Sequence, residues 1–342
     1  MKLSTRIKKR LGMGAALTAL VLGVTSCGAI TTGNESEGGD GSFELAPYIQ
    51  ERVDSGDPLR VVLSYHDPSL AFATPIQKGM KNAAEEFGVE AKLIGPTGGD
   101  AAQQVSELQT LIQQQAIDGL AVSSASSDAL KPVITQAYQA GIPIISFNTD
   151  NPDSDQMGFV GQDLKESGLS QAEQLLEELD GTTEGKVVVF SVDTGAGWSF
   201  DRFSGFEEGL ADSGLEIVGP VNVGNEPSEA YNTVQSTMAG QSDVVAIAGL
   251  DCCSTTAAAQ WIEGSGNTGE IAMVGFDLLP TTAEFIESGV VNFTISQNPE
   301  EQGYQAVKVL YDFLVDGVEV SGADTGAEFI TKDNLSEATV EG

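Results

Sequence analysis

The chain is poor in histidine, cysteine and basic residues. Its 342 residues include one His, three Cys and 16 Lys+Arg, against 50 Asp+Glu. A single imidazole excludes a His-rich zinc site, and we expect no metal and no cofactor. The formal net charge of −34 excludes a nucleic-acid partner, because Lys and Arg are needed to neutralise phosphates. Such acidity also suggests a salt-adapted source, since salt screens self-repulsion.

The common sequence signatures of catalysis are also absent. The chain contains no Gly-x4-Gly-Lys-Ser/Thr phosphate loop and no Gly-x-Ser-x-Gly nucleophile elbow. Gly195-x-Gly197-x-x-Phe200 lacks the third Gly of a dinucleotide fingerprint. His66 lies too close to Ser64 in the sequence to indicate a catalytic triad. We therefore predict that the protein is not an enzyme, and an exported hydrolase is the less favoured alternative.

The N-terminus has the features of an export leader. The first 26 residues hold five basic and no acidic residues, and the apolar run Leu11–Val24 has the length of a signal-peptide core but is too short to cross a bilayer. Val24-Thr25-Ser26-Cys27 resembles a bacterial lipobox, in which small residues precede a lipidated Cys. We predict a lipoprotein signal peptide over 1–26 and a lipid anchor at Cys27. The protein is then extracytoplasmic, on the periplasmic side or the outer face of the cell membrane, and contacts the membrane only through its lipid.

Residues 27–57 are rich in Gly and acidic residues, which is typical of a flexible acidic linker between the lipid and a folded domain. A short helix is predicted around Phe43–Val53.

From Leu59 onward, short apolar runs alternate with amphipathic stretches. The predicted strands are Arg60–Ser64, Glu90–Ile94, Gly119–Ser123, Pro143–Phe147, Lys186–Val192, Glu216–Val218, Val244–Ala248, Ile271–Phe276 and Val291–Ser296. The predicted helices are Thr74–Phe87, Ala101–Gln115, Ser127–Ala140, Lys165–Leu179, Phe203–Ser213, Ser228–Ala239, Thr255–Ser265, Thr281–Ser288 and Pro299–Asp316. Continuous Val/Ile/Leu runs indicate strands covered on both faces, and the strand–helix order indicates parallel sheets. The length favours two doubly wound α/β lobes facing a shared cleft.

Polar and aromatic residues follow these strands, at the sheet edge where open α/β sheets bind ligands. They are Tyr65, His66, Ser123, Asn148, Thr149, Asp150, Trp198, Asp251, Asp277 and Gln297, with Phe72 nearby. Carboxylates and amides bond adjacent hydroxyls, and aromatic rings cover C–H surface. The pattern predicts a neutral polyhydroxylated ligand.

Three motifs carry a resemblance to a known family: Gly141-Ile142-Pro143-Ile144-Ile145, Val274-Gly275-Phe276-Asp277 and Ile295-Ser296-Gln297-Asn298-Pro299. Over Leu59–Asp316 the chain resembles the sugar-binding type I periplasmic binding proteins of ABC transporters, which include the ribose binders. The resemblance implies a monomer that delivers its ligand to an ABC permease and ATPase. It also implies a three-crossing hinge near Gly161–Asp163, Gln297–Pro299 and Val320–Ala323. The implied lobes are residues 58–161 plus 298–321 and residues 162–297 plus 322–342.

The resemblance assigns ligand contacts to the positions that match the family's motifs. These are Phe72, Asn148, Arg202, Asp251, Asp277 and Gln297. Asn148 and Thr149 stand where the ribose binder has Asp and Arg, and Asp251 stands where the family has Asn. These departures argue against a ribose-like pyranose fit.

A second branch of the family is also similar. Gly95-Pro96-Thr97 with Ser123-Ser124 resembles the rhamnose and autoinducer-2 binders, in which case Asp150 and Asp201 would contact the ligand. A nucleoside receptor on the same fold is a further alternative. It would require paired aromatic stacking, for which Phe72 and Trp198 are the candidates.

Several candidates have a structural alternative. Asp277 is also placed to cap the helix predicted at Thr281, although its strand-end position favours ligand contact. Arg202 is also compatible with a surface ion pair to Asp201 or Glu207. As one of few cations in an acidic chain, it is interpreted as a ligand group.

The aromatic candidates and the histidine have alternatives as well. Trp198 lies in a Gly-rich segment, which predicts an exposed loop and a functional role. Phe72 fits a core position equally well, and His66 fits a structural or rim hydrogen bond.

The adjacent residues Cys252 and Cys253 directly follow Asp251. In an oxidising compartment they either form a strained vicinal disulfide or stay reduced and buried, and the sequence favours neither state. A disulfide would give the cleft a rigid apolar plate.

Overall fold

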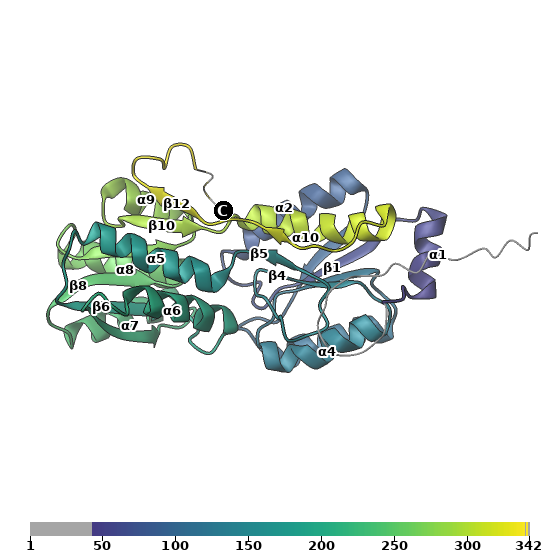
Figure 1. Ribbon diagram of the computed structural model, residues 1–342, viewed down its shortest axis with the longest axis horizontal. Helices are drawn as coiled ribbons and strands as arrows, with labels where there is room; N and C mark the ends of the chain where they lie inside the picture. The colour runs from purple at the N-terminus through teal and green to yellow at the C-terminus, as the bar shows by residue number, and fades with distance from the viewer. Residues whose placement is uncertain (1–42, 339, 341–342) are drawn as a thin grey trace, which may run out of the picture.

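The computed structural model describes residues 43–338 and 340. The predicted signal peptide, Cys27 and linker residues 27–42 lie outside these described residues. Two α/β lobes lie end to end along the longest axis of the molecule (Figure 1). Among the described residues, no helix combines the length and apolar character needed to span a membrane.

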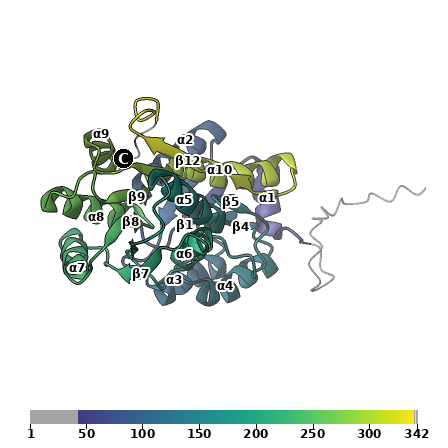
Figure 2. The same cartoon turned by 60° about the vertical axis from the view of Figure 1, so that its left-hand side comes forward.

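The first lobe is built on a six-stranded sheet in the order β11-β5-β4-β3-β1-β2. Its strands are β1 (Arg60–Ser64), β2 (Glu90–Ile94), β3 (Gly119–Val122), β4 (Ile144–Phe147), β5 (Phe159–Gly161) and β11 (Ala323–Asp324). Its helices are α1 (Pro47–Ser55), α2 (Ala73–Phe87), α3 (Ala101–Gln113), α4 (Ser127–Gln139) and α10 (Pro299–Tyr311), which a π-helical turn continues over Asp312–Asp316. Helices α2 and α10 pack on one face of the sheet and α3 and α4 on the other (Figure 2), as right-handed crossovers require.

The second lobe repeats this plan with the order β12-β10-β9-β8-β6-β7. Its strands are β6 (Lys186–Ser191), β7 (Glu216–Asn222), β8 (Val244–Gly249), β9 (Ala272–Phe276), β10 (Phe293–Ser296) and β12 (Glu328–Thr331). Its helices are α5 (Leu164–Glu178), α6 (Gly197–Leu210), α7 (Pro227–Ala239), α8 (Cys252–Ser265) and α9 (Pro280–Ser288). All neighbouring strands are parallel except β10 and β12, which are antiparallel. The two-lobed parallel α/β fold is the one predicted from the sequence.

Three segments connect the lobes. The chain crosses after β5, after β10, and between β11 and β12. Ala323 and Asp324 pair with Val160 and Gly161 in the first sheet, so the third crossing lies after Asp324 rather than at the predicted Val320–Ala323. The difference arises because a two-residue edge strand has no readable hydrophobic pattern.

Residues 43–57 are part of the first lobe and not of a flexible linker. Ile49 is fully buried, the Ala46 amide donates to Gly141 O at 2.9 Å, and the Tyr48 hydroxyl donates to Ile117 O at 2.9 Å. The predicted linker therefore does not extend over this segment. The short predicted helix is present as α1, shifted toward Ser55.

Glycine lets one pair of helices in each lobe come into backbone contact. A Cβ on Gly79 of α2 would lie 1.7 Å from the carbonyl oxygen of Glu300 in α10. A Cβ on Gly168 of α5 would lie 2.0 Å from the carbonyl oxygen of Arg202 in α6. Only residues without a Cβ permit this approach. The second contact fixes the backbone from which Arg202 projects.

Candidate functional site

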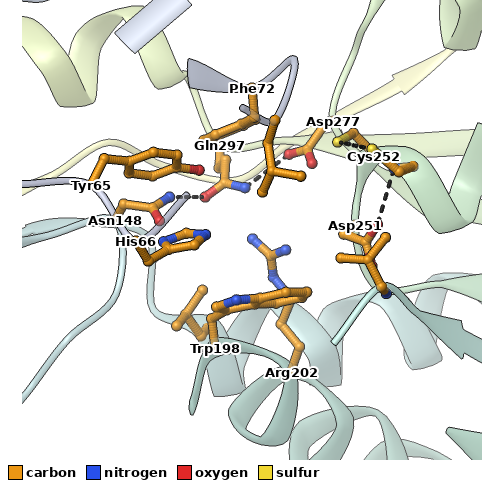
Figure 3. A pocket seen from close by; sticks show the side chains of 14 residues that line it. Tyr65, His66, Phe72, Asn148, Trp198, Arg202, Asp251, Cys252, Asp277 and Gln297 are labelled. Carbon is orange, nitrogen blue, oxygen red and sulfur yellow. Dashed lines mark hydrogen bonds between the residues drawn. The ribbon is translucent and has the colours of Figure 1, made fainter. Parts of the chain in front are cut away.

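A cavity lies between the two lobes, at the carboxyl ends of the strands. It measures about 410 Å³ including the space at its mouth. Its lining side chains are Tyr65, His66, Leu70, Phe72, Asn148, Leu164, Val192, Trp198, Arg202, Asp251, Cys252, Cys253, Asp277 and Gln297 (Figure 3). The walls are mostly apolar, and a few polar groups converge on the centre.

The first lobe contributes a wall without a charged side chain. Tyr65 and His66 directly follow β1, and Asn148 directly follows β4 in the left-handed conformation, with φ 60°. Burial lowers the pKa of His66 to about 4, so its imidazole is neutral at physiological pH. Phe72 is 4% exposed and closes this side of the cavity.

The second lobe contributes the charged groups. Trp198 and Arg202 project from the first turns of α6, Asp251 caps α8, and Asp277 directly follows β9. The helix α6 begins at Gly197 rather than at the predicted Phe203. Trp198 is therefore a buried helical residue, 8% exposed, and not part of an exposed loop.

A chain of hydrogen bonds links the two walls through the hinge. Ser123 Oγ lies 2.8 Å from His66 Nδ1 and donates to Asn148 Oδ1 at 3.1 Å. Asn148 Nδ2 donates to Gln297 Oε1 at 3.5 Å, and Gln297 Nε2 donates to Asp277 Oδ1 at 2.8 Å. The chain therefore joins groups of the first lobe to Asp277 of the second lobe.

Arg202 is a buried cation with an incomplete set of partners. It is 3% exposed, its guanidinium carbon lies 3.9 Å from the centroid of the Phe276 ring, and Nη1 donates to Leu250 O at 2.8 Å. Nη2 donates to Gln162 Oε1 at 3.3 Å, whereas Nε has no hydrogen-bond partner. The surface ion pair with Asp201 or Glu207 is therefore not what the structure shows. A buried, unpaired N–H beside the cavity can donate to a ligand oxygen.

Asp277 is the carboxylate most available to a ligand. Burial raises its pKa from 3.8 to about 6, although the nearby Arg202 charge and the Gln297 hydrogen bond act in the opposite direction. It does not cap the following helix, because α9 begins at Pro280 with Leu279 at its N-cap. The capping alternative for Asp277 is thus wrong.

Asp251 differs because backbone amides occupy its carboxylate. Oδ1 accepts from the amides of Cys253 and Ser254, and Oδ2 accepts from the amide of Val192 at 2.9 Å. Burial raises the pKa of Asp251. Asp251, Cys252 and Cys253 have donor atoms within 4.8 Å of one another. With Asp251 engaged as a helix cap, the two thiols alone are an incomplete ligand set for a metal.

The lobes are closed over the cavity. Asn225 Nδ2 of the second lobe donates to Asp67 Oδ2 of the first lobe at 3.1 Å, beside the mouth. Cys252 and Leu279 of the second lobe are packed into the core cluster of the first lobe. A ligand inside would contact both lobes at once.

Four predicted site residues lie elsewhere. Ser123 and Thr149 are buried behind the cavity wall, with their hydroxyl oxygens 3.3 Å apart. Asp150 and Asp201 line a separate groove near the hinge, together with Asp163. The structure therefore does not bring Asp150 and Asp201 to the central cavity.

Sequence reasoning missed three apolar lining residues: Leu70, Leu164 and Val192. Leu164 begins α5 directly after the first crossing, and Val192 directly follows β6. The position of each of these two residues at the end of an element is its only sequence signal. An apolar residue that lines a cavity has the same sequence pattern as an apolar residue in a hydrophobic core.

Asp277 gives a testable pH dependence of stability. In the folded protein the Asp277 carboxyl is protonated below about pH 6, whereas in the unfolded chain it is protonated only below about pH 3.8. The contribution of Asp277 to the free energy of unfolding therefore rises as the pH falls from about 6 to about 3.8. A salt-bridged carboxylate has the opposite pH dependence, because its pKa is lowered in the folded state. Relative to Asp277→Asn, the wild type should gain on the order of 2–3 kcal/mol of unfolding free energy between pH 7 and pH 4. Urea unfolding at both pH values measures this gain, and a constant difference would contradict it.

Two lobes closed over one buried, polar-centred cavity define a cleft-type solute receptor. A family model described as a periplasmic binding protein domain matches residues 61–317. The chain belongs to this family of periplasmic binding proteins. This confirms the predicted family and agrees with the prediction that the protein binds a ligand rather than catalysing a reaction.

Individual relatives are similar over most of the chain. The xylose/arabinose-binding protein XylF of Sulfolobus acidocaldarius is 27% identical over 318 residues, covering 87% of this chain and 78% of that protein. The xylitol-binding protein of Mycolicibacterium smegmatis is 26% identical, covering 97% and 88%. A solute-binding protein of Burkholderia graminis, solved with D-arabinose, superposes with a TM-score of 0.77 at 25% identity, covering 82% and 98%.

Proposed function

We propose that this protein is the substrate-binding component of an ABC importer and captures a monosaccharide or a closely similar polyol. The observation that carries the proposal is the closed cavity itself. Its apolar walls, formed by side chains such as Phe72 and Trp198, suit the C–H faces of a sugar. Arg202 Nε and the Asp277 carboxylate supply one donor and one acceptor for hydroxyl groups.

Binding is coupled to closure because the two walls belong to different lobes. A ligand that bonds Asn148 on one side and Asp277 on the other favours the closed state by its differential contacts. A membrane permease then receives the ligand from the closed form. The basic head, apolar core and Cys27 of the N-terminus support lipid anchoring outside the cytoplasm.

Three of the relatives indicate a ligand with five carbons, although others are described as binding allose, or glucose and galactose. Those named above bind xylose and arabinose, xylitol, or D-arabinose, according to their descriptions. Asn148 and Thr149 replace the charged pair that the ribose binders carry, so the first wall holds no ionic contact for the sugar. We infer a pentose or pentitol as the preferred class.

A thermal-shift screen tests the function. The panel holds D-xylose, L- and D-arabinose, D-ribose, xylitol, glucose, galactose, rhamnose, inositol, autoinducer-2 and nucleosides. A ligand at one hundred times its dissociation constant should add about 2.7 kcal/mol of stability, which is a shift of several degrees. We expect a pentose or pentitol to give the largest shift. A shift with a nucleoside alone, or with no member of the panel, would contradict the proposal.

A further inference from the structure

The cavity wall contains two adjacent thiols that the proposed sugar contacts do not use. Cys252 and Cys253 are the first two residues of α8, and their sulfur atoms are 3.2 Å apart. Cys252 is 4% exposed and Cys253 is partly exposed. Both side chains line the cavity, and Cys252 lies on the side opposite Tyr65 (Figure 3).

We infer that Cys252 and Cys253 form a reversible dithiol–disulfide switch, which a small-molecule disulfide oxidises and which alters the ligand cavity from within. Two observations carry this inference: the sulfurs already face each other, and the pair lies at the contact between the lobes.

Lobe closure controls access to the pair. Cys252 belongs to the second lobe but is packed into the core cluster of the first, and Cys253 contacts the cores of both lobes. Separating the lobes removes one side of this packing and exposes the thiols to solvent. In the closed state, the hydrogen bond to Cys253 and burial raise the pKa of the Cys252 thiol. Because the thiolate is the attacking species, oxidation proceeds from the open state.

The exchange reaction is balanced in two steps. The thiolate of Cys253, the more exposed residue, attacks one sulfur of the small disulfide, whose S–S bond breaks and releases one thiolate. The thiolate of Cys252 then attacks Cys253 Sγ in the mixed disulfide and releases the second thiolate. Two electrons pass from the protein to the small disulfide, and the two released thiolates take up the two protons.

The resulting disulfide is strained and therefore easily reduced. Neighbouring Cα atoms lie about 3.8 Å apart, whereas disulfide-linked residues usually have Cα atoms about 4.4–6.8 Å apart. Strained disulfides have more oxidising potentials and are the labile ones. The pair is thus suited to reversible change rather than to permanent stabilisation.

Oxidation of the two cysteines affects Asp251 and Asp277 through the backbone amides in the first turn of α8. The amides of Cys253 and Ser254 donate to Asp251 Oδ1, and the Cys252 amide is hydrogen-bonded to Asp277. Closing a small ring between Cys252 and Cys253 changes the backbone that carries these donors. We expect the oxidised protein to bind sugar at least tenfold more weakly, a consequence that rests on the proposed function.

Mass spectrometry tests the redox chemistry without any sugar. In a Cys27→Ser background, Cys252 and Cys253 are the remaining cysteines of the chain. After equilibration with oxidised glutathione and alkylation, the intact chain should lack two hydrogen atoms and carry no alkyl group, and dithiothreitol should reverse this. In the same background, Cys252→Ser should stop at one glutathione adduct. Two alkylated thiols, two glutathione adducts or a disulfide-linked dimer would overturn the inference.

Thermal shift then tests the consequence for binding. The reduced and oxidised Cys27→Ser protein is compared with D-xylose, L-arabinose and xylitol, and the Cys252→Ser variant serves as a control that cannot close the ring. A smaller shift in the oxidised protein supports the switch, and equal shifts in both forms overturn it. If no sugar shifts either form, the proposed function fails, while the mass measurement still decides the thiol chemistry.

Discussion

Replacing Asp277 with Asn should weaken sugar binding by roughly ten- to a hundredfold, because a hydrogen bond to a charged group contributes about 1.5–3 kcal/mol. The carboxylate accepts from Gln297 Nε2 and from the Cys252 amide, and its side chain lines the cavity. An amide of the same size carries no charge and only one acceptor oxygen, for which Gln297, the Cys252 amide and the ligand then compete. Isothermal titration calorimetry with the sugar from the screen measures the change.

The Asp277→Asn substitution should not strain the backbone. Asp243 provides a matched control. Asp277 has φ 70°, a left-handed conformation that Asn also tolerates. Asp243 is exposed, lies in the same lobe and has φ 60°. Asp243→Asn makes the same chemical change on the same kind of backbone, and its affinity should equal that of the wild type. Equal affinity in the two variants would remove Asp277 from the site.

Placing a methyl group on Gly79 should destabilise the protein by roughly 2–3 kcal/mol or more, in the upper range for overpacking. The new Cβ would lie 1.7 Å from the Glu300 carbonyl oxygen and 2.9 Å from the Tyr304 amide nitrogen. These are backbone atoms and cannot rotate away, so α2 and α10 must separate. Equilibrium urea unfolding of Gly79→Ala measures the loss.

Gly264→Ala is the matched control for this clash. Gly264 is also helical, but its Cβ would meet only the Tyr231 hydroxyl, at an ordinary 3.6 Å. The same substitution there should stabilise the protein by up to about 1 kcal/mol through helix propensity. A stabilising effect at both positions would show that the close approach of α2 and α10 does not constrain the first lobe.

Regular elements were predictable because their patterns are local. The strand Arg60–Ser64 has the predicted bounds, since a continuous apolar run flanked by turn residues defines a buried parallel strand. Glu90–Ile94 also has the predicted bounds, although it is a sheet-edge strand that contains two charged residues and is only partly buried. The short strands β5, β11 and β12 were missed. β11 and β12 are edge strands and β5 lies next to an edge, where tertiary contacts and not sequence periodicity decide the conformation.

The site was predictable to the extent that strand ends determine it. Tyr65, Asn148 and Gln297 line the cavity because parallel strands direct their carboxyl ends to one edge. The start of α6 was hidden by Gly195 and Gly197, which read as a loop. The contacts of each side chain depend on residues that are distant in the sequence. The local sequence therefore does not show that backbone amides donate to Asp251, or that Asp201 lines the groove near the hinge.

The fluorescence of Trp198 tests the central claim most directly. The chain has two Trp residues, so in Trp261→Phe the cavity residue Trp198 is the sole Trp. Titration with the pentose or pentitol from the screen should change its emission saturably, at one sugar per chain, with the dissociation constant that calorimetry gives. Calorimetric binding of that sugar without any change in Trp198 emission would place the ligand outside this cavity and contradict the account.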